Sequence, residues 1–270
     1  NTDLKKGLAP RIAALDVLQA VGNGTYADKA LDRALLKHQI SPIDKGLVTE
    51  LAYGSIRKRL FLDSWIDYLG KLSATRQKPT IRWALHLGLY QILCMEKIPV
   101  SAAVNTTVEL IKCTKMNRLS SFVNGLLRSA LRARDAGLHP PLPKDPSEHL
   151  AQRESLPLWF VKDLVKWRGL EGAESFARAS NRSPVIDIRV NRLRSTTERV
   201  IKDFEREGLK CFHIENCPYG LQLASGSGSL NNLPGFAKGH WLVQDRSSQW
   251  VVPLLEPLSG QKVLDACAAP

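Results

Sequence analysis

Paired cysteines and long apolar runs are both missing from this sequence of 270 residues. The five cysteines form an odd, scattered set without a CxxC pair: Cys94, Cys113, Cys211, Cys217 and Cys267. This pattern excludes a disulfide scaffold and is typical of a reducing cytosol. No apolar run reaches the roughly 18 residues that span a bilayer. We therefore expect a cytoplasmic protein with no membrane partner.

Metal-ligand spacing is also lacking. Cys211, His213 and Cys217 lie close together in the sequence, but no fourth ligand follows at the spacing of a zinc site. We therefore expect no metal. A secretory signal and an initiator methionine are missing as well, and we expect that residues precede the amino end.

The positive charge is unevenly distributed. The net charge is +12, and residues 1–134 hold 21 Lys and Arg against 10 Asp and Glu, whereas the rest holds 17 against 16. A basic excess in one module attracts polyanions, of which nucleic acid is the first candidate. The alternative is a solvated, solubilising surface. The candidate contacts to RNA phosphates are Arg57, Lys58, Arg59, Arg76, Lys78, Arg82, Arg118, Arg128, Arg132 and Arg134.

Apolar spacing divides the chain into two kinds of structure. Residues 10–134 repeat the helical spacing, as in the stripe from Ile81 to Leu93, and show no alternation of period two. Helix starts are marked by Ser41-Pro42 and Pro79-Thr80. This half predicts an all-α bundle of about six or seven helices, the size of one ordinary domain.

A proline-rich stretch follows, and then the period changes. Helical spacing returns from Leu158 to Ala179, and strands are predicted at residues 185–191, 210–214, 220–224 and 241–245, with a helix opened by a capping box at Ser195. This order predicts a small α/β subdomain of the ferredoxin or RRM type. The aromatic residues typical of an RRM surface are not evident, so base stacking is not expected there.

The final stretch organises the domain prediction. Val263 to Pro270 reads as the end of a parallel strand that gives way to a loop of small residues, where a ligand can approach the backbone. A parallel strand needs neighbours, so we expect a longer protein with a further domain. The predicted domains are residues 1–135 (helical), 136–157 (proline-rich linker), 158–258 (helical plus α/β) and 259–270 (start of a Rossmann-like domain).

Several motifs resemble one known family. Residues 265–270, Asp-Ala-Cys-Ala-Ala-Pro, are similar to the opening of the S-adenosylmethionine loop D-x-C-A-A-P-G-G-K of RNA cytosine carbon-5 methyltransferases. Residues 122–128 resemble the last-helix signature shared with the NusB antitermination factor, and residues 188–192 resemble the first strand of the methyltransferases' middle domain. Together these features resemble the bacterial RsmB (Fmu/Sun) family, which methylates small-subunit ribosomal RNA, and the resemblance covers nearly the whole chain.

The resemblance implies roles for particular residues. The S-adenosylmethionine loop would include Asp265, Cys267, Ala268, Ala269 and Pro270. The nucleophilic cysteine belongs to motifs expected beyond Pro270, so no catalytic residue is assigned here, and the chain by itself is expected to be inactive. The implied partner is small-subunit ribosomal RNA, bound by a monomer.

Other interpretations stay open. The chain is alternatively a non-catalytic RNA-binding or antitermination protein of the NusB type, or an unrelated helical scaffold fused to a nucleotide-binding domain. Asn191 and Asp245 either contact substrate or cofactor or cap backbone groups. His86 and the six tryptophans are expected to pack in cores or between domains.

Overall fold

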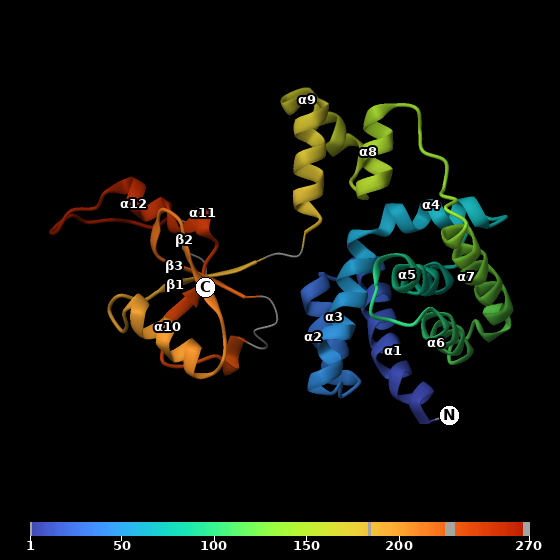
Figure 1. Cartoon of the computed structure of the whole chain (residues 1–270), viewed down its shortest axis with the longest axis horizontal. Helices are drawn as coiled ribbons and strands as arrows, with labels where there is room; N and C mark the ends of the chain where they lie inside the picture. The colour runs from blue at the N-terminus through green and yellow to red at the C-terminus, as the bar shows by residue number, and fades with distance from the viewer. Residues whose placement is uncertain (1, 183–184, 225–229, 267–270) are drawn as a thin grey trace. The chain divides into compact units, whose positions relative to one another are not determined.

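The computed structural model describes residues 2–182, 185–224 and 230–266 (Figure 1). Contacts divide the chain into two compact units, and Arg182 is the last residue of the first. We call the part up to Arg182 the helical unit and the part after it the sheet unit. Within the described ranges, no helix combines the length and the apolar character that crossing a membrane requires.

The helical unit confirms the predicted all-α bundle. Its last two helices, α8 and α9, follow the segment that the apolar stripes of residues 10–134 define. The elements, with two 3-10 turns, are α1 (Thr2–Gly22), α2 (Ala27–Lys37), α3 (Pro42–Arg57), α4 (Arg59–Leu69), η1 (Ala74–Arg76), α5 (Pro79–Cys94), α6 (Val100–Lys112), η2 (Asn117–Leu119), α7 (Ser120–Asp135), α8 (Pro146–Glu154) and α9 (Leu158–Ser180).

Helix α5 is the centre of the bundle. It begins at Pro79, whose fixed φ suits a first helical turn, and nearly every residue from Ile81 to Ile92 is buried. It packs against α1, α3, α4, α6 and α7, and Figure 1 looks nearly along its axis, with these helices around it. A helix buried on all sides must be apolar all round. The single stripe predicted for it therefore underestimates its burial.

The predicted linker 136–157 contains a helix. Asp145 caps α8, because its carboxylate accepts a hydrogen bond from the backbone N–H of Glu148 at 2.9 Å, and Pro146 occupies the first turn. The prolines that suggested an extended linker thus mark a helix start at this position. Residues 136–145 hold no regular secondary structure.

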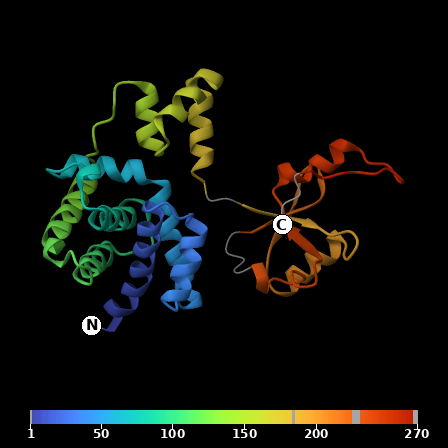
Figure 2. The ribbon, with the colours of Figure 1, turned by 180° about the vertical axis from the view of Figure 1, so that it is seen from behind.

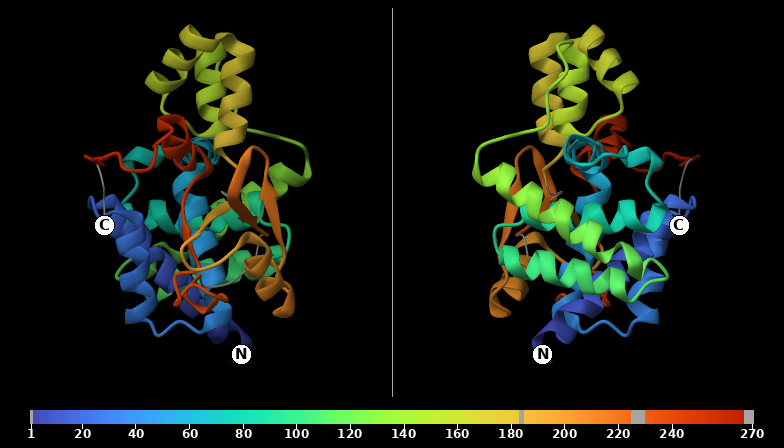
Figure 3. Two further views of the ribbon diagram at one scale, coloured as in Figure 1. Left: turned by 90° about the vertical axis from the view of Figure 1, so that its left-hand side faces the viewer. Right: turned by 90° about the vertical axis from the view of Figure 1, so that its right-hand side faces the viewer.

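Helices α8 and α9 lie side by side and share a small core of their own (Figure 3). The Ser155 hydroxyl accepts a hydrogen bond from the N–H of Leu60 at 2.8 Å, which satisfies a free donor at the start of α4. Gly169 interrupts α9 with φ of 69°, a conformation that glycine adopts without steric cost. The pair α8–α9 therefore belongs to the helical unit, in which α8 also contacts α4.

The sheet unit confirms the ferredoxin-like prediction. Its strands β1 (Ile186–Val190), β2 (Cys211–Ile214), β3 (Cys217–Leu223) and β4 (Trp241–Val243) form an antiparallel sheet in the order β2-β3-β1-β4. Helix α10 (Thr197–Arg206) covers one face, as the view from behind also shows (Figure 2). The core between them includes Ile188, Phe204 and Trp241. Short helices α11 (Arg246–Gln249) and α12 (Val251–Leu255) follow β4.

The strand predicted at the end of the sequence is not formed in this structure. Residues 261–265 have no regular secondary structure, and the side chains of Val263 and Leu264 are 59% and 86% exposed. A parallel strand needs a hydrogen-bonded neighbour. The four strands among the described residues instead pair antiparallel with one another. Cys267 to Pro270 lie outside the described residues.

The close contact of α5 with α7 predicts opposite effects for two glycine substitutions. A Cβ at Gly88 would lie 2.7 Å from a methyl carbon of buried Leu127, whereas a Cβ at Gly46, on the exposed side of α3, meets nothing within 4 Å. We expect Gly88→Ala to lower the free energy of unfolding by about 1–3 kcal/mol through overpacking. Gly46→Ala should raise it by about 0.5–1 kcal/mol. Urea unfolding followed by circular dichroism measures both, and a stabilised Gly88→Ala variant would contradict this packing.

Candidate functional site

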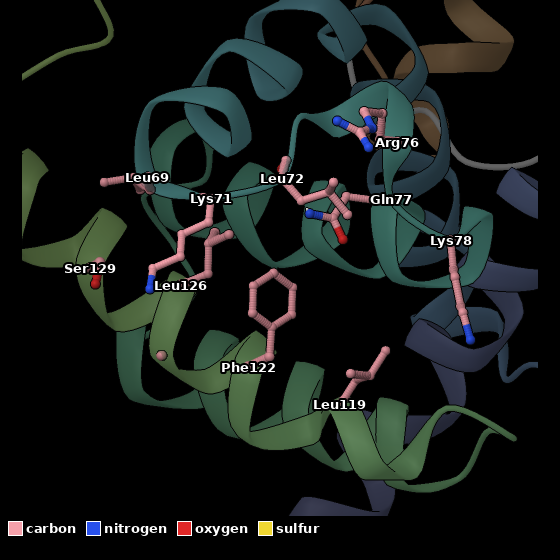
Figure 4. Close-up of a pocket in the computed structure, with 12 residues that line it drawn as sticks. Leu69, Lys71, Leu72, Arg76, Gln77, Lys78, Leu119, Phe122, Leu126 and Ser129 are labelled. Carbon is pink, nitrogen blue, oxygen red and sulfur yellow. Dashed lines mark hydrogen bonds between the residues drawn. The ribbon is translucent and has the colours of Figure 1, made fainter.

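A groove of about 680 Å³ lies in the helical unit between the α4–α5 connection and α7. Its floor is apolar and its rim is basic. Figure 4 shows the Phe122 ring standing from α7 into the middle of the groove, toward Leu72. The lining residues are Leu69, Gly70, Lys71, Leu72, Arg76, Gln77, Lys78, Leu119, Phe122, Gly125, Leu126 and Ser129.

Two side-chain hydrogen bonds, one from the end of α4 and one from within the connection, hold the loop that carries the basic rim. Asp67 accepts a hydrogen bond from the N–H of Ala74 at 2.6 Å, and the Gln77 amide donates to the carbonyl of Leu72 at 2.9 Å. Side-chain bonds of this kind stabilise turns that regular structure leaves unpaired. The exposed cations Lys71, Arg76 and Lys78 thus project from a loop with a defined course.

A second, more polar cavity of about 440 Å³ adjoins the groove and shares Gln77 with it. Arg59 lies on this side, with its guanidinium carbon 5.9 Å from the centre of the Trp83 ring. Such cation–π contacts hold a guanidinium in place without neutralising it. The structure therefore brings four of the predicted RNA-binding residues around two adjoining cavities: Arg76 and Lys78 line the groove, and Arg59 and Arg82 line the second cavity.

Arg82 differs from the other three cations because it is paired with an acidic residue, Asp63. Its Nε donates to Asp63 at 2.8 Å, and His86 lies on the same carboxylate, with Nε2 2.8 Å from Oδ1. Asp63 and His86 are both buried. Because Asp63 offsets the charge of Arg82, we exclude this arginine from the proposed RNA contacts.

The pKa values of this network are shifted by two opposing effects. Burial disfavours the carboxylate of Asp63, but hydrogen bonds from His86 and Arg82 outweigh it and hold its pKa below the ordinary value. Burial dominates at His86 and lowers its pKa. The second ring nitrogen of His86, Nδ1, has no hydrogen-bond partner among the described residues, which fits a neutral imidazole.

The remaining predicted cations lie in different surroundings. Arg57 and Lys58 are half-buried at the junction of α3 and α4, and Arg118 is exposed in η2. On α7, Arg128 donates to Asn124, and Arg132 donates to the hydroxyl of Ser129, which lines the groove. Arg134 is occupied by Asp135 and the carbonyl of Ile92.

Sequence reasoning missed Lys71 and Phe122 as parts of the groove. Lys71 follows Gly70, the residue after α4. Its position in a loop was the one sequence feature that could have indicated a binding role. Phe122 belongs to the apolar stripe of α7 and would be assigned to the core from periodicity, yet it is 37% exposed. Neither the pattern nor the charge distinguishes a groove floor from a core.

The implied cofactor residues form no cradle among the described residues. Asp265 lies in an exposed segment without regular structure, and Cys267, Ala268, Ala269 and Pro270 lie outside the described ranges. A cofactor loop at a strand end requires the sheet around it. Because four of the five implied residues lie outside the described ranges, we derive no step through S-adenosylmethionine.

Other sequence predictions can be compared with the structure. Asn191 and Asp245 cap backbone groups: Asn191 bonds Gly239 and Leu193, and Asp245 accepts from Ser247. Within the described ranges, no three His, Cys, Asp or Glu side chains gather as metal ligands would. Trp65, Trp83 and Trp241 pack in cores as predicted, whereas Trp159, Trp167 and Trp250 are exposed and belong to no core of their own unit.

Comparisons with known proteins assign both units. Residues 8–132 match the NusB family, and residues 156–228 match the ferredoxin-like domain of RsmF/B-like methyltransferases. The crystal structure of PH0851 has the same fold, with a TM-score of 0.68 and 20% identity over 92% of this chain and 55% of that one. The chain therefore joins an RNA-methyltransferase ferredoxin-like domain to a NusB-type helical domain.

Curated relatives narrow this class. The chain is 37% identical to the "Probable ribosomal RNA small subunit methyltransferase B" of Synechocystis sp., over 91% of this chain and 55% of that protein. It is 32% identical to the ribosomal RNA small subunit methyltransferase B of Klebsiella pneumoniae, over 99% of this chain and 60% of that protein. The chain is similar to these methyltransferase B proteins over nearly its whole length, and it spans between half and two thirds of the length of these relatives.

The buried His86 predicts a pH dependence of stability. Its pKa lies below the ordinary 6.5, so as the pH falls below that value the unfolded chain takes up a proton that the folded chain does not. The free energy of unfolding should then fall by up to about 1.4 kcal/mol per pH unit. His86→Gln, which can still donate to Asp63, should flatten this slope, whereas His149→Gln on α8 should keep it. Urea unfolding over a pH series measures the slopes, and equal slopes for wild type and His86→Gln would contradict the prediction.

The basic rim predicts a charge effect that depends on position. The triple variant Lys71→Gln, Arg76→Gln, Lys78→Gln should bind single-stranded RNA more weakly, and its logarithmic salt slope should shrink by about 0.7 for each phosphate that the variant no longer neutralises. Filter binding over a salt series measures both. The control carries Lys45→Gln, Lys97→Gln and Lys162→Gln, three exposed residues of the helical unit away from the groove. If the two triple variants lose the same affinity, the rim cations attract RNA only through the total charge of the protein, and the predicted contacts at the rim are wrong.

Proposed function

We propose that this chain is the RNA-positioning part of an S-adenosylmethionine-dependent ribosomal RNA cytosine-C5 methyltransferase. Three observations support this proposal: the two domain matches, the names of the curated relatives, and the similarity of Asp265 to Pro270 to a cofactor loop. The groove of the helical unit carries the argument for RNA, because it combines a basic rim with an apolar, aromatic floor.

The groove suits an unpaired RNA strand. Lys71, Arg76 and Lys78 are exposed along one rim, where phosphates of a strand would pass. Phe122 offers a ring on which a base can stack, and stacking of this kind is sequence-tolerant and contributes about 1–3 kcal/mol per base. A duplex keeps its bases stacked inside and would leave the apolar floor uncovered. We therefore favour a loop or single-stranded region of small-subunit ribosomal RNA as the ligand.

Two cysteines of the sheet unit are poor nucleophiles. Burial raises the pKa values of the Cys211 and Cys217 thiols. Attack on a cytosine ring needs a thiolate, which a raised pKa makes scarce at neutral pH. This supports the assignment of the nucleophile to motifs beyond Pro270. We propose that the protein acts as a monomer in the cytoplasm, where its ribosomal substrate is assembled.

The non-catalytic NusB-type alternative accounts for less of the chain. It explains the helical unit but gives no reason for residues 156–228 to match the ferredoxin-like domain of RsmF/B-like methyltransferases. A sheet unit of this type next to the helical unit in the sequence is what the methyltransferase proposal requires.

Residues 1–270 should bind small-subunit ribosomal RNA without methylating it. The reason is that the described residues hold no formed cofactor site, and that the resemblance assigns the nucleophilic cysteine to motifs beyond Pro270. Filter binding with rRNA fragments measures the first property, and transfer of tritiated methyl from S-adenosylmethionine to RNA measures the second. Transfer should occur with a chain extended through the nucleophilic cysteine motifs. Methylation by residues 1–270 alone would overturn this assignment of roles.

A further inference from the structure

The sheet unit contains a cavity of about 500 Å³, lined in part by residues 189–192 of the strand motif. It lies where the end of β1, the start of β3, β4 and the α11–α12 segment meet. Six of its lining residues carry the argument: Arg189, Arg192, Tyr219, Leu242, Gln249 and Trp250.

Helix α10 covers one face of the sheet, and the opposite face is open at the end that borders the cavity. Along β1, Ile188 and Val190 point into the core under α10, so Asp187 and Arg189 belong to the opposite face. Arg246 of α11 bonds Asp187 at 2.7 Å and also Gln222, which closes one end of that face. At the other end, Arg189 pairs across the sheet with Gly220 and Leu242. That end borders the cavity.

The floor of the cavity is preformed. Gln249 is buried, and its amide donates to the carbonyls of Ile188 and Gln244 at 3.3 and 2.9 Å, while its oxygen accepts from the Cys217 thiol at 3.1 Å. A Cβ at Gly220 would lie 3.0 Å from that oxygen, so glycine lets Gln249 approach the sheet closely. A floor with satisfied polar groups can hold a ligand without first rearranging.

The walls combine positive charge with aromatic rings. The guanidinium of Arg192 lies 4.5 Å from the centre of the Tyr219 ring, and Arg189 donates to the side chain of Gln244. No carboxylate lines the cavity, and neither arginine has an ion-pair partner within the part of the chain that the structure describes. Trp250 and Leu242 are 40% and 45% exposed. The site therefore offers guanidinium donors for an anion beside surfaces for a flat ring.

Guanidinium groups beside aromatic rings complement the two parts of a nucleotide, its phosphate and its base. Guanidinium planes and aromatic rings stack on bases, and guanidinium groups bind phosphate through paired hydrogen bonds. We propose that this cavity binds one unpaired nucleotide of an RNA strand, with its base against Trp250 or the Arg192–Tyr219 stack and its phosphate at Arg189 and Arg192. The proposal rests on the RNA-binding function proposed above and adds a second contact, located in the sheet unit.

An apolar protein surface is the competing occupant. Val251, Leu254 and Leu255 of α12 are exposed and would suit such a surface. Two arginines without acidic partners favour the nucleotide, because a buried protein contact would leave their charges uncompensated. The experiment separates the two occupants.

The test uses the 270-residue chain and an eight-nucleotide single strand that carries 4-thiouridine. Tyr219→Leu should weaken binding about 5-fold or more, since stacking contributes about 1–3 kcal/mol per base, and Tyr219→Phe should stay close to wild type. Arg192→Gln should also weaken binding. The matched control is Arg199→Gln, an exposed residue of α10. Photocrosslinks should map to the peptides that contain Tyr219 or Trp250.

Each remaining outcome decides against a defined part of the proposal. If Tyr219→Leu and Arg192→Gln bind the strand as wild type does while the triple variant of the groove binds it more weakly, the nucleotide site is wrong and the RNA-binding function stands. If wild type binds no RNA, the proposed function itself fails. Saturation by free CMP under conditions where the strand does not bind overturns the assignment to a strand. If Tyr219→Leu or Arg192→Gln alters the self-association of the protein on sedimentation but leaves RNA binding as in wild type, the cavity binds a protein surface and not a nucleotide.

Discussion

The burial of α5 on every side is the constraint on which the helical unit depends. Five other helices cover it, so its close contacts need small residues, as Gly88 shows against Leu127. A helix enclosed in this way also places any polar side chain it carries under strong desolvation. His86 is tolerated because Asp63 accepts a hydrogen bond from the Nε2–H of its ring, and Arg82 in turn donates to Asp63. The same ion pair fixes the first turn of α5 and with it the end of the loop that forms the basic rim. Core packing and the candidate RNA groove therefore share one structural origin.

Periodicity predicted the parts of the fold whose burial is one-sided. Ile188 and Val190 of β1, and Val200 and Phe204 of α10, enter the core at the predicted spacing, because each element turns one face to the core. Sequence patterns failed where one residue type is compatible with two local structures. Proline marks both an extended linker and a first helical turn, and Asp145, a capping residue, was the signal that favoured a helix at Pro146. The strand expected at Val263 failed for a different reason, since a parallel strand is defined by neighbours that its own residues cannot supply.

The candidate sites were less predictable than the fold, and charge explains why. A list of basic residues identifies the helical unit as the cationic half but not which cations converge. Arg82 and Arg76 are indistinguishable in the sequence, yet one is paired with buried Asp63 and the other is exposed on the groove rim. The partner that separates them, Asp63, lies on a different helix. Phe122 and Tyr219 were hidden in a similar way, because an aromatic residue in an apolar pattern is assigned to a core unless its exposure is known.

Net charge is a poor guide to where an anion binds, and the sheet unit shows this more clearly than the helical unit. Its half of the chain is nearly balanced in Lys, Arg, Asp and Glu, yet the cavity at the end of β1 contains two arginines and no carboxylate. The balance is reached by separating the charges: Asp187 is used to hold Arg246 and α11 at one end of the sheet face, which leaves Arg189 without an acid at the other. Long-range attraction to RNA depends on the total charge of a module, whereas a bound nucleotide responds to the few groups within hydrogen-bonding reach. A strongly basic helical unit and a neutral sheet unit with one cationic cavity can therefore act on the same strand in different ways, the first by raising its local concentration and the second by fixing a single nucleotide.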